Sequence, residues 1–222
     1  MGTITRSFAN NITTNGILLP ASLNNASLTN VTAYNASVAT GNMVLISSQT
    51  ASNSASISFT TGINSTYKEY QFVFVDIYPR TQRGVFGFNL SSDGGSNYNV
   101  TKTSAVFIAF QNEGGTDTLL GYDTGADLAQ STSDQKLTQP ITNASDSSAS
   151  GTMSLFNPAS TTYVKHFIGS SNCMVITSDF TEYYCMVHYT AGYGNTTSAI
   201  NAVRFQMSTG NFDGTILMYG IV

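Results

Sequence analysis

The chain has 222 residues, of which only 9% are charged while 41% are hydrophobic. A typical soluble domain carries about 25% charged residues, so the polar surface of this protein must consist mainly of hydroxyl and amide groups. The net charge is −4, and the eight basic residues are spread along the chain. This distribution argues against binding to nucleic acid or to an anionic membrane surface, both of which need clustered cations.

The first forty or so residues differ from the rest of the chain. Asn25, Asn30 and Asn35 recur at five-residue spacing, and no charged residue occurs between Arg6 and Lys68. A segment with so few bulky residues cannot bury itself alone. We therefore predict that residues 1–45 form an extended arm for attachment and oligomerisation, although an unstructured tail remains an alternative. The predicted anchoring residues of the arm are Ile4, Phe8, Ile12, Ile17, Leu18, Leu23 and Leu28.

From Met43 onward, alternating apolar residues and Gly- or Asp-bearing turns predict strands. The expected strands are 43–50, 54–60, 69–77, 85–90, 104–110, 150–157, 163–168, 172–177, 184–190, 199–207 and 215–221. Residues 112–139 are polar and predict long loops with one or two short strands. No segment combines a helical stripe with a cap. Residues 46–222 are thus expected to form an all-β domain, an antiparallel β-sandwich of jelly-roll type.

The strand at 69–77 carries apolar residues in both alternating positions. Aromatic side chains occupy one face, and Val73, Val75 and Ile77 occupy the other. Because apolar residues on both faces indicate burial on both sides, we predict that this strand is central and covered on both faces.

The two cysteines flank a predicted hairpin centred near Asp179. In that register Cys173 and Cys185 lie directly opposite each other, and the separation permits a cross-strand disulfide. We predict two small buried thiols that stay reduced, with the disulfide as the alternative.

The other reactive residues do not combine into a catalytic or metal site. Cys173, Cys185 and His188 could offer three zinc ligands, but Cys185 and His188 are three residues apart on a strand and point to opposite faces. His166 and His188 are each expected to be half-buried strand residues. We predict no catalytic residue, no metal ligand and no cofactor. The turn at Asp93 is expected to be a plain tight turn, with a calcium site as the alternative.

Tyrosines near loops and strand ends suggest a glycan contact. Aromatic rings stack on sugar faces, and Asn and Asp side chains bind sugar hydroxyls. The predicted contact residues are Tyr122, Asp123, Tyr193 and Asn195. Packing of these rings under loops or within a subunit interface is the alternative.

Several sequence segments resemble those of a group of virion structural proteins of marine bacteriophages, cyanophages among them. These segments are ITRSFANNITTNGIL, SASISFTTGINSTYKEYQFVFVDIYP, SSDGGSNYN, SGTMSLFNPASTTYVKHF and AGYGNTTSAINAVRFQMSTGNFDGTILMYGI. The resemblance implies a non-enzymatic fibre or head-decoration protein, assembled in the host cytoplasm and located in the virion. The expected partners are other capsid or tail proteins, bound through the arm. The five-residue repeat of the arm adds the expectation of a homotrimer. A host-glycan adhesin is the alternative, followed by a polysaccharide depolymerase.

Overall fold

The computed structural model describes residues 42–176 and 181–222. In these residues the chain forms strands and no helix, so the predicted all-β class and antiparallel pairing are confirmed. The predicted anchoring residues from Ile4 to Leu28 lie outside the described residues. The strands are β1 (Met43–Ser54), β2 (Ser56–Phe59), β3 (Glu69–Pro79), β4 (Phe86–Ser91), β5 (Lys102–Asn112), β6 (Thr118–Tyr122), β7 (Gln135–Lys136), β8 (Ala149–Phe156), β9 (Lys165–Ile176), β10 (Tyr183–Gly194), β11 (Ala202–Met207) and β12 (Phe212–Ile221).

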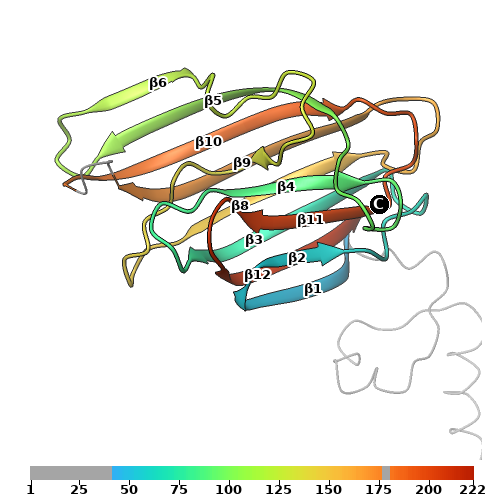
Figure 1. Cartoon of the computed structure of the whole chain (residues 1–222), viewed down its shortest axis with the longest axis horizontal. Coiled ribbons are helices and arrows are strands. Elements are labelled where there is room, and N and C mark those ends of the chain that lie inside the picture. The colour runs from blue at the N-terminus through green and yellow to red at the C-terminus, as the bar shows by residue number, and fades with distance from the viewer. Residues whose placement is uncertain (1–41, 177–180) are drawn as a thin grey trace, which may run out of the picture. The chain divides into compact units, whose positions relative to one another are not determined.

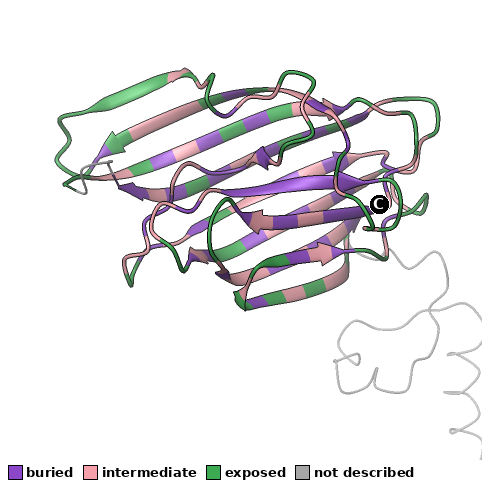
Figure 2. Ribbon diagram, in the orientation of Figure 1, coloured by how far each residue is buried: buried purple, intermediate pink, exposed green. Residues whose placement is uncertain are grey.

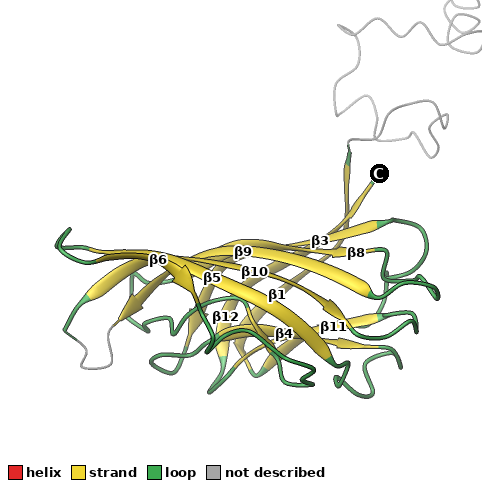
Figure 3. Ribbon diagram, turned by 90° about the horizontal axis from the view of Figure 1, so that it is seen from above, coloured by secondary structure: helices red, strands yellow, loops and turns green. Residues whose placement is uncertain are grey.

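The strands form two antiparallel sheets of unequal size (Figure 1). The large sheet has eight strands in the order β1-β12-β3-β8-β9-β10-β5-β6, and the small sheet has four in the order β2-β11-β4-β7. Figure 3 shows β4 and β11 on one side of the large sheet. This arrangement is a two-layered sandwich. The jelly-roll part of the prediction, which implies two Greek keys, is not confirmed by this strand order.

The core lies between the two sheets and is built around one phenylalanine. Phe205 of β11 is fully buried. Its ring lies within 5.2 to 6.4 Å, centroid to centroid, of five other rings. These rings belong to Phe59, Phe72, Phe74, Phe86 and Phe88. Figure 2 shows the resulting concentration of buried residues along β4 and β11.

The strand that comes first in the sequence, β1, pairs with the strand that comes last, β12. β12 lies between β1 and β3, and Met43 of β1 pairs with Ile221 of β12. The large sheet therefore begins within the last residues of the segment predicted as the arm.

The prediction that β3 is covered on both faces is wrong. Tyr70, Phe72 and Phe74 are buried, but Val75 is exposed. Asp76 then adopts a positive φ of 51° and shifts the register, so that Ile77 returns to the core side of the sheet. A β-bulge of this kind re-aims the side chains that follow it.

Among the described residues, no helix is long and apolar enough to cross a membrane.

Candidate functional site: the outer face of the large sheet

The face of the large sheet turned away from the small sheet is called the outer face here. Directly paired residues on antiparallel strands share a face, so the strand registers define rows that run across it. One row contains a residue from every strand of the sheet. This central row is Ser48, Leu217, Val73, Thr152, Ser170, Tyr189, Phe107 and Tyr122.

The central row changes chemistry along its length. It begins with Ser48 on β1, continues with aliphatic residues on β12 and β3 and hydroxyl residues on β8 and β9, and ends with three aromatic residues on β10, β5 and β6. The exposed fractions of Tyr189, Phe107 and Tyr122 are 43%, 48% and 57%. Half of each aromatic side chain is therefore available to a partner, although each belongs to a regular strand.

The rings of Phe107 and Tyr189 stack on each other, with centroids 5.3 Å apart and an interplanar angle of 21°. Each ring thus has one face occupied by its neighbour. A sugar ring would meet the ring edges and one remaining face. Apolar side chains of another protein can pack against edges and faces alike, so this stacked pair is better suited to a protein partner.

The two rows that flank the central row are also uncharged. One contains Leu45, Tyr219, Gln71, Ser154, Ile168, Ala191 and Ala105. The other contains Thr50, Thr215, Val75, Ser150, Asn172, Val187, Ala109 and Leu120. No Asp, Glu, Lys, Arg or His occurs in these three rows, and Leu45, Val75, Ile168 and Leu120 are exposed. These three rows therefore present apolar, hydroxyl and amide side chains with no charge among them. A carboxylate lies beside them, because Glu69 is two residues before Gln71 on the same face of β3 and accepts a hydrogen bond from Ser154 Oγ at 2.7 Å.

The predicted glycan residues Tyr122 and Asp123 are adjacent in sequence but have different partners. The Tyr122 hydroxyl donates a hydrogen bond to Asp127 Oδ2 at 2.7 Å, which raises the pKa of the tyrosine. Asp123 instead accepts a hydrogen bond from Gln139 Nε2 at 2.6 Å. Gln139 in turn lies 3.4 Å from Nδ1 of buried His188. Asp123 is thus part of the network behind the sheet, while Tyr122 belongs to the outer face.

Tyr193 and Asn195 lie together at the far end of β10. Tyr193 pairs with His166, and the two rings make an edge contact with centroids 6.1 Å apart. Asn195 Nδ2 donates to Gln130 Oε1 at 2.9 Å, and Gln130 Nε2 donates to Thr103 Oγ1 at 2.8 Å. Because Tyr193 is four residues from Tyr189, about 13 Å along the strand, the four predicted glycan residues do not form one site.

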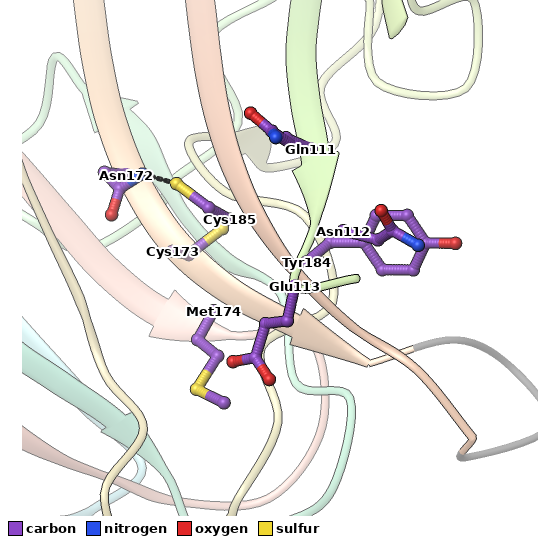
Figure 4. Close-up of a pocket in the computed structure, with 8 residues that line it drawn as sticks. All are labelled: Gln111, Asn112, Glu113, Asn172, Cys173, Met174, Tyr184 and Cys185. Atoms are coloured by element: carbon purple, nitrogen blue, oxygen red, sulfur yellow. Dashed lines mark hydrogen bonds between the residues drawn. The ribbon is translucent and has the colours of Figure 1, made fainter. Parts of the chain in front are cut away.

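The cysteines lie in a pocket at the other end of β9 and β10 (Figure 4). Cys173 pairs with Met186 and Cys185 pairs with Met174, so the predicted register is wrong by one residue. The cysteines consequently face opposite sides of the sheet, and both are free thiols.

Burial raises the pKa of Cys173 to about 12, which keeps this thiol protonated. Cys185 is exposed, and its sulfur accepts a hydrogen bond from Asn172 Nδ2 at 3.2 Å. The prediction of two buried thiols therefore holds for Cys173 alone.

The two histidines are not half-buried as predicted. His188 is fully buried on the inner face, where it lies under the 123–141 loop, and desolvation lowers its pKa to about 4. His166 is exposed on the outer face. Since Cys185 is exposed and His188 is buried, the expected divergence of these two side chains is confirmed.

The turn at Asp93 uses both carboxylate oxygens in local hydrogen bonds. Oδ1 accepts from Ser91 Oγ at 2.7 Å and from the Asn97 main-chain N–H at 2.9 Å, while Oδ2 accepts from Asn97 Nδ2 at 2.8 Å. These bonds lower the pKa of Asp93 to about 2. In the described part of the chain, no group of three or more His, Cys, Asp and Glu side chains could hold a metal ion.

No protein-family model, curated protein or solved structure matches the chain.

Proposed function

We propose that the chain is a non-enzymatic structural protein of a bacteriophage particle, and that the outer face of its large sheet is a contact surface between copies of the chain. The observation that supports this proposal is the set of three uncharged rows on the outer face, with exposed apolar side chains on several strands. Contiguous exposed apolar surface on a soluble protein marks an interaction site when it exceeds a few hundred Å². The sequence resemblance to phage virion proteins supplies the biological setting.

The outer face suits a partner of the same composition. Its three rows offer hydroxyl groups in the middle and apolar groups on both sides, and no residue in them carries a charge that would need a counter-charge. In a two-fold dimer the outer faces of two copies would meet through the same residues. In a ring such as a trimer, one part of the surface of each copy would contact a different part of the next copy. The segment 1–45 keeps its proposed role as the attachment arm, and a homotrimer remains the proposed oligomer.

The oligomer proposal is tested by sedimentation of the full chain and of an Ile168→Asp variant. Ile168 is exposed in a flanking row of the outer face. We expect the wild-type chain to sediment as an oligomer at micromolar concentration. The introduced carboxylate would be buried unpaired in the contact, so the variant should dissociate at concentrations at least tenfold higher than wild type.

The matched control is Tyr163→Asp, which places a carboxylate at an exposed position outside the three rows. It should leave the oligomer intact. A wild-type monomer, or an Ile168→Asp oligomer as stable as wild type, would contradict the proposed contact surface. The virion setting is tested separately by labelling purified particles with antibodies to residues 42–222, and unlabelled particles would contradict it.

A second candidate function, a host-glycan contact, is favoured at Tyr193 alone. Its ring meets His166 edge-on, and Asn195, two residues further along the chain, donates a hydrogen bond to Gln130. Glycan-array binding that is lost in Tyr193→Ala and kept in Tyr163→Ala would support this function. Equal binding by the two variants, or no binding by wild type, would exclude it.

A further inference from the structure

A buried lysine and a buried asparagine meet where the two sheets come together. Lys102 begins β5 of the large sheet and Asn89 lies in β4 of the small sheet. Their exposed fractions are 0% and 2%. Lys102 Nζ lies 2.6 Å from Asn89 Oδ1 and 2.9 Å from the main-chain oxygen of Val100. Both of these partners are amide oxygens.

The Asn89 amide is held in one orientation by its other hydrogen bonds. The main-chain N–H of Leu90 donates to Oδ1 at 2.9 Å. The amide nitrogen Nδ2 donates to Asp134 Oδ1 at 2.8 Å and to the main-chain oxygen of Thr132 at 2.9 Å. The oxygen of the amide therefore faces hydrogen-bond donors, and its nitrogen faces a carboxylate.

We propose that Lys102 and Asn89 form an intramolecular isopeptide bond, with Asp134 as the group that transfers the proton. Lys102 Nζ, as the neutral amine, attacks Asn89 Cγ and forms a C–N bond. The Asp134 carboxylate takes a proton from the attacking nitrogen and delivers it to Asn89 Nδ2. The Cγ–Nδ2 bond then breaks, and ammonia leaves. One amide replaces another, so no oxidant, reductant or cofactor is needed.

The surroundings of the three residues match the requirements of this reaction. Desolvation lowers the pKa of Lys102 to about 8, although the charge of Asp134 opposes this shift. The neutral, nucleophilic amine is thus accessible near neutral pH. The Leu90 N–H is placed to stabilise negative charge that develops on Oδ1. Holding the two reacting groups in contact removes the entropic cost of bringing them together.

Asp134 is itself positioned by β11. Gln206 Nε2 donates to its Oδ2 at 2.5 Å, and Arg204 Nη2 lies 3.4 Å from its Oδ1. The oxygen that contacts Asn89 Nδ2 is therefore oriented by neighbours on a regular strand. Formation of the bond would link the small sheet to the large sheet covalently.

Lys165 provides an internal comparison. It is also fully buried, but its Nζ donates to two main-chain oxygens, those of Tyr163 at 2.6 Å and Thr196 at 3.3 Å. Main-chain amides of this kind have no free NH₂ group to release. Burial lowers the pKa of both lysines, whereas the proposed reaction is specific to Lys102.

The proposal is tested first by intact mass spectrometry of the denatured full chain. We expect a mass lower than that of the sequence by about 17 Da, the mass of one ammonia. Trypsin should fail to cleave after Lys102 and should yield the peptide 84–136, while cleavage after Lys165 proceeds normally. Chymotryptic cleavage after Tyr98 should leave the fragments that contain Asn89 and Lys102 joined. A wild-type chain of full sequence mass that releases the peptide 84–102 would overturn the proposal.

Variants then assign the roles. Lys102→Met and Asp134→Asn should both keep the full mass, because the first lacks the nucleophile and the second lacks the proton acceptor. Lys165→Met should still show the loss of ammonia. Mass loss in Lys102→Met would overturn the assignment of the nucleophile, and mass loss in Asp134→Asn would overturn the role of Asp134. These masses are read on denatured protein, and the wild-type result decides the proposal even if a variant fails to fold.

Discussion

At the scale of single residues, His188 is a buried base in a chain that otherwise contains few charges. Its Nδ1 lies 3.4 Å from Gln139 Nε2. Desolvation is the largest cause of its lowered pKa, and the charge of Lys136 adds to it. The charge of Asp123 and a main-chain hydrogen bond at Lys136 act in the opposite direction. Burial prevails, so the imidazole is neutral in the folded protein at neutral pH.

We expect the lowered pKa of His188 to make the protein less stable in mild acid. Between the unfolded pKa of 6.5 and the folded pKa of about 4, the unfolded chain binds more protons than the folded chain. The contribution of His188 to the free energy of unfolding is therefore complete above pH 6.5 and is lost as the pH falls toward 4. The loss amounts to about 3 kcal/mol, measured by urea denaturation at several pH values.

The control for this prediction is the exposed histidine of the outer face. A His188→Gln variant should lack the loss of stability between pH 6.5 and 4, while His166→Gln should keep it. Identical pH profiles for wild type and His188→Gln would contradict the prediction.

At the scale of elements, β10 is held closely between its neighbours. A Cβ atom added to Gly192 would lie 2.4 Å from the main-chain oxygen of Thr103 on β5 and 2.7 Å from Cζ of Phe167 on β9. The main-chain contact cannot be relieved by a rotation of a side chain. Glycine is thus required here by the spacing of the strands.

We expect Gly192→Ala to destabilise the protein by about 1–3 kcal/mol, the usual cost of overpacking. For a domain of this size, this corresponds to a fall in Tm of about 2–4 °C for each kcal/mol, measured by thermal denaturation. Gly114→Ala is the matched control, because an added Cβ there would lie no closer than 3.6 Å to another residue. It should leave Tm within about 2 °C. Equal Tm values for wild type and Gly192→Ala would contradict the close fit of β10.

The strands were largely predictable from the sequence, because the alternation of apolar and polar residues identifies a strand with one buried face. The bulge at Asp76 was not predictable, because Asp–Ile within an apolar run carries no turn signal. This bulge decides that Ile77 is buried rather than on the same face as Val75. The predicted register of β9 and β10 was wrong by one residue. The alternation of apolar and polar residues identifies each strand, but it does not show how many residues form the turn between them.

The outer face was only partly predictable. Tyr122 and Tyr193 were found as aromatic residues near strand ends, but their separation depends on which strands pair. Phe107 and Tyr189 were missed as a pair, since they are far apart in sequence and meet only through the β5–β10 register. Burial of Lys102 had no sequence signal at all, because lysine is ordinarily exposed.

At the scale of the whole molecule, strands distant in sequence are paired in both sheets. Phe59 of β2 pairs with Val203 of β11, and Val44 of β1 pairs with Gly220 of β12. Non-local pairing requires long loops to close before contacts form. We therefore expect refolding in milliseconds to seconds rather than microseconds.

This rate can be measured by stopped-flow circular dichroism after dilution from urea, a suitable method because the chain has no tryptophan. The Lys102→Met variant serves as a comparison without the proposed covalent link, and it should refold no faster than wild type. Complete refolding within microseconds would contradict the non-local pairing.

The placement of β12 between β1 and β3 has a consequence for synthesis on the ribosome. Among the described strands, β1 has β12 as its only neighbour in the large sheet, and residues 212–221 are translated long after residues 43–54. During translation the backbone groups of β1 therefore have no partner within the sheet. Neighbouring nascent chains on one messenger RNA carry the same unpaired segment at the same time. Protection of this segment, by a chaperone or by another copy, is needed until the final strand leaves the exit tunnel.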